Sequence, residues 1–394
     1  MKDIFVIPGK IITAIGIDEI QNFSNFNKNI SGISLIKNSK YSESDFYGAE
    51  VNSELIDIEF SKTKYQNRSI SKSPERFTKF EKMIIITMDD IINKTGLDLK
   101  SKRTGLILST TKGNINLLEH SDGSIPYSRI KLWDTANTIS NFFEIQTKPV
   151  VVSNACISGV LAIITGARLL NQGKYDNVLI CGADVLSKFV VSGFQSFKSL
   201  GKTPCKPFDK DRDGLTLGEG AGTLLLTSVE EHVKISKDIQ NQTVLFKSGT
   251  TAGDANHISG PSRTGDGLFL AISKAIREAS NPVIDYISAH GTATVYNDDM
   301  ESFAISRAEL NDVPTNSIKG YIGHTLGAAG IIETIVGINS MNENLIYATK
   351  GCEYVGVQNK INVITRNFST KINNFLKIAS GFGGCNAAAV FSKL

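Results

Sequence analysis

Cys156 stands in the segment SNACISG, directly after the β-branched run Val150–Val152. The apolar residues after it recur at helical spacing as far as Ile164, so we expect the cysteine on a turn between a strand and a helix. A thiol at a helix N-terminus faces unpaired N–H groups and the positive end of the helix dipole, which favours the thiolate. The spacing therefore predicts a nucleophile suited to thioesters. The alternative is a buried structural cysteine.

Two histidines stand in similar glycine-flanked positions. His290 ends the apolar segment 283–289 and precedes Gly291, while His324 follows Gly323 and precedes LGAAG, which opens an apolar helix. The small residues of LGAAG permit close packing of this helix. Residues at the ends of buried strands often carry function. Either histidine alone could be a core or loop residue, but two in such surroundings favour a shared site.

Four motifs occur in a fixed order: the cysteine, HGT at His290, KGYIGH before LGAAG, and GFGG at Phe382. This order resembles the β-ketoacyl-acyl-carrier-protein synthases of the KAS I and KAS II type. The segment CKPFDKDRDGLTLGEGAGTLLL, residues 205–226, also resembles a connecting segment of that family. The similarity extends from about Arg76 to the last strand.

The resemblance implies an α/β protein of the thiolase-like fold, with two similar halves in a five-layered αβαβα arrangement. Strand-like and helical runs alternate along the chain, as this class requires. We place the junction near residue 235, so that residues 1–235 carry the cysteine and residues 236–394 carry both histidines. The polar region 38–73 is expected to be a surface excursion.

The implied reaction is a decarboxylative Claisen condensation that extends an acyl or polyene chain by two carbons. Cys156 would hold the acyl group, while His290 and His324 would bind the malonyl thioester carbonyl and stabilise the enolate. Neutral imidazoles that donate hydrogen bonds suit a developing oxyanion, so neither a metal nor a separate cofactor is expected. The substrates would be carried on the phosphopantetheine of an acyl carrier protein.

The resemblance also assigns roles to residues around the three reactive side chains. Lys319 would support the site, with Glu333 as its acidic partner. The backbone N–H groups of Cys156 and Phe382 would form the oxyanion hole, because GFGG lets the backbone approach closely. The expected substrate-binding residues are Thr292 and Thr294 for the pantetheine arm, Phe194 and Phe382 for the acyl tunnel, and Gly383.

Carrier proteins are acidic, so a docking surface needs basic residues. Arg76, Lys79 and Lys82 recur at three-residue spacing and would share one helical face, which resembles the basic docking helix of the family. Lys198 falls where the family often has a basic residue. A solvated helix face is the alternative for each of them.

Composition limits the other possibilities. The 394 residues include 42 Lys and Arg against 39 Asp and Glu, so the net charge of +3 gives no reason to expect nucleic acid as a partner. Five cysteines without CxxC spacing indicate neither zinc nor disulfides, and they fit a reducing cytoplasm. No stretch approaches the roughly 20 apolar residues of a membrane span, and the N-terminal apolar segment is expected to be the first strand.

Three alternatives stay open. A thiolase would need a second catalytic cysteine ahead of the C-terminal glycines, whereas Cys385 follows them. A homodimer is expected, but a heterodimer with a subunit resembling a chain length factor is possible, with this chain as the catalytic subunit.

Two features depart from the family pattern: Asn154, in place of the usual threonine, and the segment STTKGN at residues 109–114. These departures favour a specialised polyketide or polyene synthase as the alternative to fatty-acid elongation.

Overall fold

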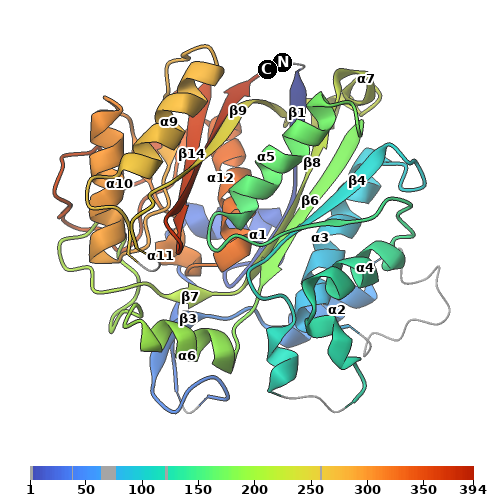
Figure 1. Cartoon of the computed structure of the whole chain (residues 1–394), viewed down its shortest axis with the longest axis horizontal. Coiled ribbons are helices and arrows are strands. Elements are labelled where there is room, and N and C mark those ends of the chain that lie inside the picture. Colours follow the sequence, from blue (N-terminus) through green and yellow to red (C-terminus); the bar gives the residue numbers. More distant parts are fainter. Residues whose placement is uncertain (1–2, 38, 64–76, 120–122, 258–259) are drawn as a thin grey trace.

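A ten-stranded sheet forms the centre of the protein. The computed structural model describes residues 3–37, 39–63, 77–119, 123–257 and 260–394. The sheet has the order β11-β10-β14-β15-β9-β1-β8-β6-β4-β5. In Figure 1, the labels β14, β9, β1, β8, β6 and β4 mark strands of this sheet. Its strands are β1 (Ile4–Thr13), β4 (Thr104–Ser109), β5 (Val150–Val152), β6 (Asn177–Asp184), β8 (Gly220–Thr227), β9 (Val244–Gly253), β10 (Tyr286–Ser288), β11 (Thr315–Asn316), β14 (Asn374–Gly381) and β15 (Cys385–Lys393).

The sheet consists of two sets of five strands with the same pattern of pairing. In the first set, β5, β4 and β6 are parallel neighbours, and β8 and β1 continue antiparallel. In the second set, β11, β10 and β14 are parallel neighbours, and β15 and β9 continue antiparallel. The two sets meet where β1 pairs with β9 over three residue pairs. The chain passes from one set to the other between Thr227 and Val244. The exact boundary at residue 235 stays a prediction.

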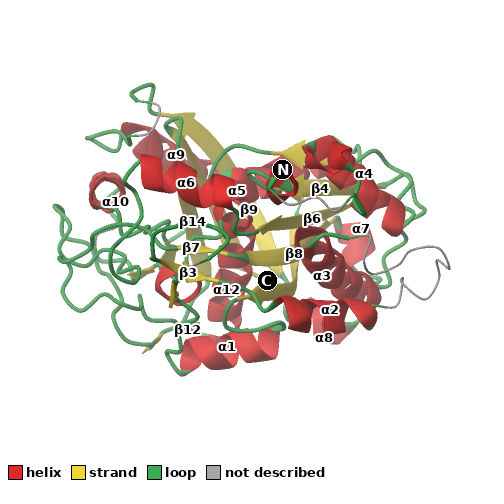
Figure 2. Cartoon of the chain, turned by 90° about the horizontal axis from the view of Figure 1, so that it is seen from below, coloured by secondary structure: helices red, strands yellow, loops and turns green. Residues whose placement is uncertain are grey.

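Helices cover the sheet in layers. The α-helices of the described residues are α1 (Glu19–Asn27), α2 (Ser53–Ser61), α3 (Lys79–Thr95), α4 (Leu132–Phe142), α5 (Ser158–Asn171), α6 (Lys188–Ser196), α7 (Val229–His232), α8 (Lys237–Gln240), α9 (Asp266–Glu278), α10 (Val295–Arg307), α11 (Lys319–Ile322) and α12 (Ala329–Glu343). Both α5 and α12 contact strands of the two sets, whereas α3 packs on the first set and α9 on the second. Figure 2 shows α3 and α9 toward opposite sides of the molecule. The predicted thiolase-like αβαβα arrangement is confirmed.

Two glycines allow the central helices α5 and α12 to touch. A Cβ added at Gly159 would lie 2.8 Å from the Cα of Gly330, and one added at Gly330 would lie 2.4 Å from the backbone N of Val160. The close packing expected of the small residues in LGAAG is therefore confirmed. Because Gly159 follows Cys156 by three residues and Gly330 follows His324 by six, this contact brings the nucleophile turn near the second histidine.

The region expected as a surface excursion is largely part of the folded body. It contains β3 (Phe46–Ala49) and α2, which packs against α3. Ile56 and Phe60 of α2 are fully buried. That prediction is wrong for residues 46–61, because two apolar residues four positions apart suffice to bury one face of a polar helix. Residues 64–76 lie outside the described residues, and Arg76 is among them.

In the part of the chain that the structure describes, five short strands lie outside the main sheet. β2 (Ser34–Ile36) and β7 (Leu217–Gly218) pair with β3, and β12 (Leu345–Ile346) pairs with β13 (Phe368–Ser369). Among the residues that the structure describes, no helix combines the length and apolar character needed to cross a membrane.

Candidate active site

Cys156 lies on the turn between β5 and α5, as its spacing predicts. Ala155 adopts a φ of 44°, in the left-handed region that is strained for a residue with a Cβ. Ser158 stabilises this turn, because its hydroxyl oxygen accepts from the backbone N–H of Asn154 at 2.7 Å and its O–H donates to the carbonyl of Ala155 at 2.6 Å. The turn thus holds Cys156 in a fixed position at the start of the helix.

The two histidines come from the second half of the chain and meet the cysteine. The Sγ of Cys156 and one ring nitrogen of each of His290 and His324 all lie within 4.8 Å of one another. The imidazole rings stand edge to face, with centroids 5.1 Å apart. Both ring nitrogens of His324 are without a hydrogen-bond partner among the described residues. They are therefore free to bind a substrate oxygen.

All three side chains line one cavity of about 320 Å³. Thr292, Thr294, Phe194 and Phe382 line it as well, whereas Gly383 does not. The ring of Phe382 stacks on Phe194 at 5.7 Å and meets Phe197 edge-on at 5.5 Å. Phe197, which the sequence analysis did not identify, is more than half exposed and lines the same cavity. Three aromatic rings therefore stand together in the wall of the cavity.

Burial controls the protonation of the three reactive side chains. It raises the pKa of the Cys156 thiol to about 12, and the lowering effect of the Lys319 ammonium is smaller. Burial also lowers the pKa of His290 and of His324 well below the usual value, and Lys319 adds to this lowering. The neutral imidazoles agree with expectation. Burial thus works against the thiolate that the helix start was expected to favour, because desolvation disfavours the charged form of the thiol.

The backbone near Phe382 approaches the nucleophile closely. A Cβ added at Gly381 would lie 3.1 Å from the backbone N of Cys156 and 3.2 Å from the Cβ of Ala155. A side chain at this position would therefore be crowded, and its neighbours would have to move by a few tenths of an ångström. Gly383 has a φ of 89° and faces open space, so its part in the site is to form the turn rather than to line the cavity. The assignment of the Cys156 and Phe382 amides to an oxyanion hole stays a prediction.

Lys319 and Glu333 form a buried ion pair behind the histidines. The Nζ of Lys319 donates to the carbonyl of His290 at 2.5 Å and lies 3.4 Å from its Nδ1. Both side chains are almost fully buried, so these are not ordinary surface charges. The pair fixes the backbone and the ring of His290.

Three buried groups that the sequence analysis missed also support the site. Lys377 of β14 contacts the second oxygen of Glu333 at 2.7 Å. Glu301 of α10 accepts from the backbone N–H groups of His290 and Gly291, both at 2.7 Å. Asp184 of β6 accepts from the backbone N–H of Gly327 at 2.7 Å, near His324, and also from the loop after β4. Lys377 could have been identified from the sequence, because it is a charged residue inside the otherwise apolar strand segment FLKIA.

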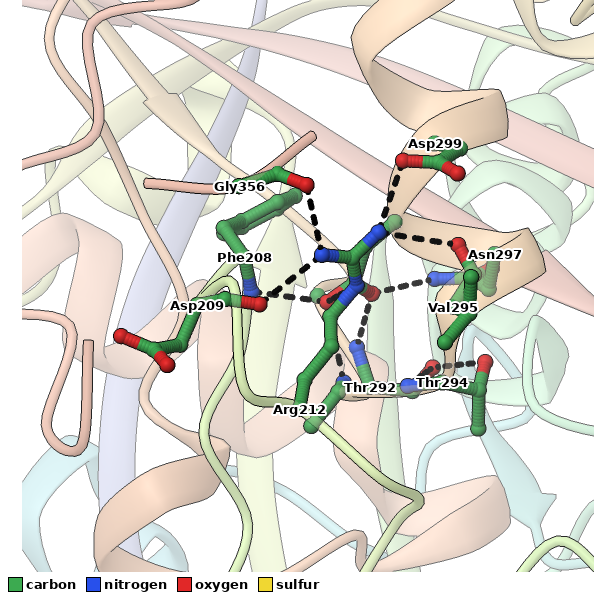
Figure 3. A network of polar contacts seen from close by, with 12 residues as sticks. Phe208, Asp209, Arg212, Thr292, Thr294, Val295, Asn297, Asp299 and Gly356 are labelled. Atoms are coloured by element: carbon green, nitrogen blue, oxygen red, sulfur yellow. Dashed lines mark hydrogen bonds and ion pairs between the residues drawn. The ribbon is translucent and has the colours of Figure 1, made fainter. Parts of the chain in front are cut away.

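Arg212 anchors the loop that carries the two threonines (Figure 3). Its guanidinium donates to the carbonyls of Asp209 and Gly356 at 2.8 and 2.9 Å, and it forms an ion pair with Asp299 at 2.7 Å. The neighbouring Asp298 accepts from the backbone N–H of Thr292 at 2.9 Å. These contacts fix the segment between His290 and α10.

The expected docking helix looks different in the structure. α3 begins at Lys79, directly after the N-cap Thr78, and Arg76 lies outside the described residues. The ammonium of Lys79 binds Glu219, which is 1% exposed, and Lys82 is paired with Asp57 at 2.8 Å. Both lysines are engaged within the protein. Lys198 is exposed and lines the cavity, so it remains available to an acidic partner.

The site also has a donor set that a soft metal ion accepts. One sulfur and two imidazole nitrogens are typical ligands of Zn²⁺, and they converge here within 4.8 Å. The same atoms face the cavity in which the substrate must react. A metal ion bound to all three would therefore occupy the nucleophile and both proposed hydrogen-bond donors. Such an ion would inhibit the condensation rather than assist it.

The fold and this constellation define a thiolase-like condensing enzyme. The chain matches the family model described as beta-ketoacyl synthase, N-terminal domain, over residues 1–232, and the corresponding C-terminal domain over residues 243–353. The chain therefore belongs to the beta-ketoacyl synthase family. The predicted enzyme class, an acyltransferase of the ketosynthase type, is confirmed.

Known proteins with similar sequences and structures support this assignment to the family. The 3-oxoacyl-[acyl-carrier-protein] synthase 2 of Vibrio cholerae is 32% identical over 279 residues, which are 66% of each chain. The ishigamide ketosynthase/chain length factor has a TM-score of 0.85 at 22% identity and covers 100% of this chain and 99% of its own. A ketosynthase of Xenorhabdus doucetiae, solved in complex with its chain length factor, has a TM-score of 0.81 at 23% identity, with 100% and 98% covered. At these identities the structures show the fold.

Proposed function

We propose that this protein condenses an acyl group held on Cys156 with a malonyl group delivered by an acyl carrier protein. The observation that carries the proposal is the convergence of Cys156, His290 and His324 on one cavity. The phosphopantetheine of the carrier supplies the thioester, and no further cofactor enters the scheme. Thr292 and Thr294 line the same cavity and are placed in the proposal as ligands of the pantetheine arm.

The first half-reaction loads the acyl group. The Sγ of Cys156 attacks the thioester carbonyl carbon, a new C–S bond forms, and the pantetheine sulfur leaves. The thiol proton passes through a neutral imidazole to the leaving sulfur, so no net charge is created. The backbone N–H groups of Cys156 and Phe382 receive the oxyanion that develops on the carbonyl oxygen.

The second half-reaction forms the carbon–carbon bond. The malonyl thioester loses its carboxylate as CO₂, and the electron pair of the broken bond forms an enolate whose oxygen accepts from His290 and His324. The enolate carbon attacks the acyl carbonyl on Cys156. The sulfur leaves and takes up one proton from solvent. The product is a 3-oxoacyl thioester that is longer by two carbons.

An acidic carrier protein is the proposed macromolecular partner, in a cytoplasmic setting. Lys198 is exposed and lines the cavity. Of the basic residues considered, it is therefore the best placed to contact a carrier protein bound at the cavity. Lys79 and Lys82 fit this role less well because their ammonium groups are engaged by Glu219 and Asp57.

A second subunit is also proposed, and the edge of the sheet supports it. β5 is the last strand in the order, and the neighbouring segments expose Leu118, Tyr127 and Trp133. We propose a homodimer through this edge, and a heterodimer with a subunit resembling a chain length factor as the alternative. The alternative is favoured by the departures at Asn154 and residues 109–114 and would suit polyketide or polyene synthesis. A purified chain that forms a dimer and condenses unaided would overturn the heteromeric form.

The test is the intact mass of the protein after incubation with acyl-carrier proteins of graded chain length. We expect one acyl adduct on the wild-type protein, and its extent over the series would give the chain length accepted. Cys156→Ala should lose both the adduct and condensation. The proposal is wrong if Cys156→Ala still forms a covalent acyl-enzyme. Cys385→Ala is the matched control and should retain the adduct.

A further inference from the structure

Lys377 is a fully buried lysine in the middle of β14. Its neighbours along the strand are apolar, and it lies opposite Ser288 in the parallel pairing of β14 with β10. Lysine is almost never fully buried unless it is paired, because taking an ammonium out of water is costly. The contacts of the buried Lys377 ammonium therefore indicate its role in the protein.

The Lys377 ammonium makes two hydrogen bonds and one ion pair. It donates to the carbonyl oxygens of Ser288 and Ala289, both at 3.1 Å, and it contacts an oxygen of Glu333 at 2.7 Å. Ala289 directly precedes His290. The ammonium therefore fixes the carboxyl end of β10, from which His290 enters the cavity.

Glu333 is shared by two buried lysines. Lys319 binds one carboxylate oxygen and Lys377 the other. Among these three residues, two ammonium groups stand against one carboxylate. The buried carboxyl of Glu301 also interacts electrostatically with both lysines, and burial raises its pKa to about 7. Lys319 also donates to the carbonyl of His290, so both lysines act on the segment that carries this histidine.

The two ammonium groups lie behind the histidines, beside the place where the condensation creates negative charge. Burial is the main cause that lowers the pKa of His290 and of His324, and the charges of Lys319 and Lys377 add to this lowering. In a buried site a fixed charge acts strongly on a developing oxyanion and needs no reorganisation during the reaction. Lys377 is not among the residues that line the cavity, so it acts through its neighbours.

We propose that Lys377 is a positioning residue of the malonyl half-reaction, which holds the end of β10 for His290 and adds a buried positive charge that favours the enolate. The inference rests on the proposed roles of Cys156, His290 and His324. It predicts that the two half-reactions respond differently when the ammonium is removed.

The test measures the rates of both half-reactions for Lys377→Met and Lys377→Ala. Each rate is divided by the fraction of protein whose Cys156 can be acylated, so that unfolded protein does not count. Decarboxylation of malonyl-carrier protein should fall about tenfold to a hundredfold in kcat, less than for a donor that touches the oxyanion. The KM for malonyl-carrier protein and the rate of Cys156 acylation should change less than about threefold, because the lost ammonium acts on the enolate. Methylammonium chloride should restore part of the loss in Lys377→Ala, while tetramethylammonium at equal ionic strength should not.

Lys94→Met is the matched control. Lys94 also bridges two carboxylates, those of Glu19 and Asp90, but it lines a second cavity that shares no lining residue with the first. It should leave both half-reactions near wild type.

Wild-type decarboxylation in Lys377→Met, or equal losses in both half-reactions, would overturn the inference. If Lys377→Met does not fold, the recovery of decarboxylation in Lys377→Ala by methylammonium tests the inference. Equal rates of decarboxylation in methylammonium and in tetramethylammonium would contradict the inference. A wild-type protein that is neither acylated nor able to decarboxylate malonyl-carrier protein would instead refute the proposed function.

Discussion

Cys156, His290 and His324 are all uncharged in the resting site. Burial raises the pKa of the thiol and lowers the pKa of both imidazoles, so the same desolvation acts in opposite directions on the two residue types. Negative charge therefore appears only while a reaction is under way. Neutral hydrogen-bond donors beside two buried ammonium groups stabilise the developing negative charge more than they stabilise the resting site.

At the residue scale, the proposed roles predict different losses for the two half-reactions. His290→Ala and His324→Ala should each slow malonyl decarboxylation by roughly two orders of magnitude, as expected when an oxyanion donor is removed. Acylation of Cys156 should fall less. The rates are measured by CO₂ release and by intact mass. His232→Gln serves as control, because His232 stacks on Phe5 and does not line the cavity. Normal decarboxylation by either alanine variant would contradict its role.

At the scale of elements, the contact between α5 and α12 determines the geometry of the site. α5 begins two residues after Cys156 and α12 five residues after His324, and each helix contacts strands of both sheet halves. The helices can only meet because Gly159 and Gly330 have no side chains. The distance between Cys156 and His324 therefore depends on two residues that take no part in the chemistry.

A methyl group at this contact should have effects on both stability and activity. Gly330→Ala places a Cβ 2.4 Å from the backbone N of Val160, so the helices must separate, at a cost of about 1 to 3 kcal/mol. Condensation should fall as well, because Cys156 and His324 move apart. Urea unfolding and a condensation assay test both effects.

Gly193→Ala in α6 is the matched control for this change. A Cβ at Gly193 meets nothing within 4 Å, and alanine is the better helix former, so this variant should be as stable as wild type or more stable. If Gly330→Ala behaves like Gly193→Ala, the contact does not have the importance inferred here.

At the scale of the whole molecule, burial of weak acids makes stability depend on pH in the alkaline range. Burial raises the pKa of Cys181 and Cys205 to about 12, as for Cys156, and it also raises the pKa of Tyr286 and Tyr321. In the unfolded chain these groups ionise near their ordinary values. Above about pH 9 the unfolded state therefore binds fewer protons than the folded state, and stability falls as pH rises.

The free energy of unfolding should decline from pH 8 to pH 10.5, with each buried thiol contributing at most about 1.4 kcal/mol per pH unit. Urea unfolding at a series of pH values measures this slope. Cys181→Ala should be less stable than wild type at neutral pH but should have a shallower slope, because one buried thiol is missing. An identical slope in the two proteins would contradict the assignment of Cys181 as a buried, protonated thiol.

Much of the fold followed from local pattern. The turn at Cys156, the strands before it and before His290, and the helix after LGAAG are encoded by apolar spacing over a few residues, and the structure has them. The polar stretch around α2 was misjudged, because its two buried residues find their partner in α3, which follows later in the chain. Local pattern reports which face is apolar, but not what covers it.

The sequence by itself determined the reactive residue types, their order and the neutral histidines expected of a decarboxylating site. Their assigned roles stay predictions. Only the tertiary structure decided that Cys156 rests as a thiol, that Lys79 is bound by Glu219, and that Lys377 shares Glu333 with Lys319. Each of these depends on burial and on contacts between distant segments. Desolvation and Coulomb energies change steeply with distance from water and from other charges, and only the packed fold sets those distances.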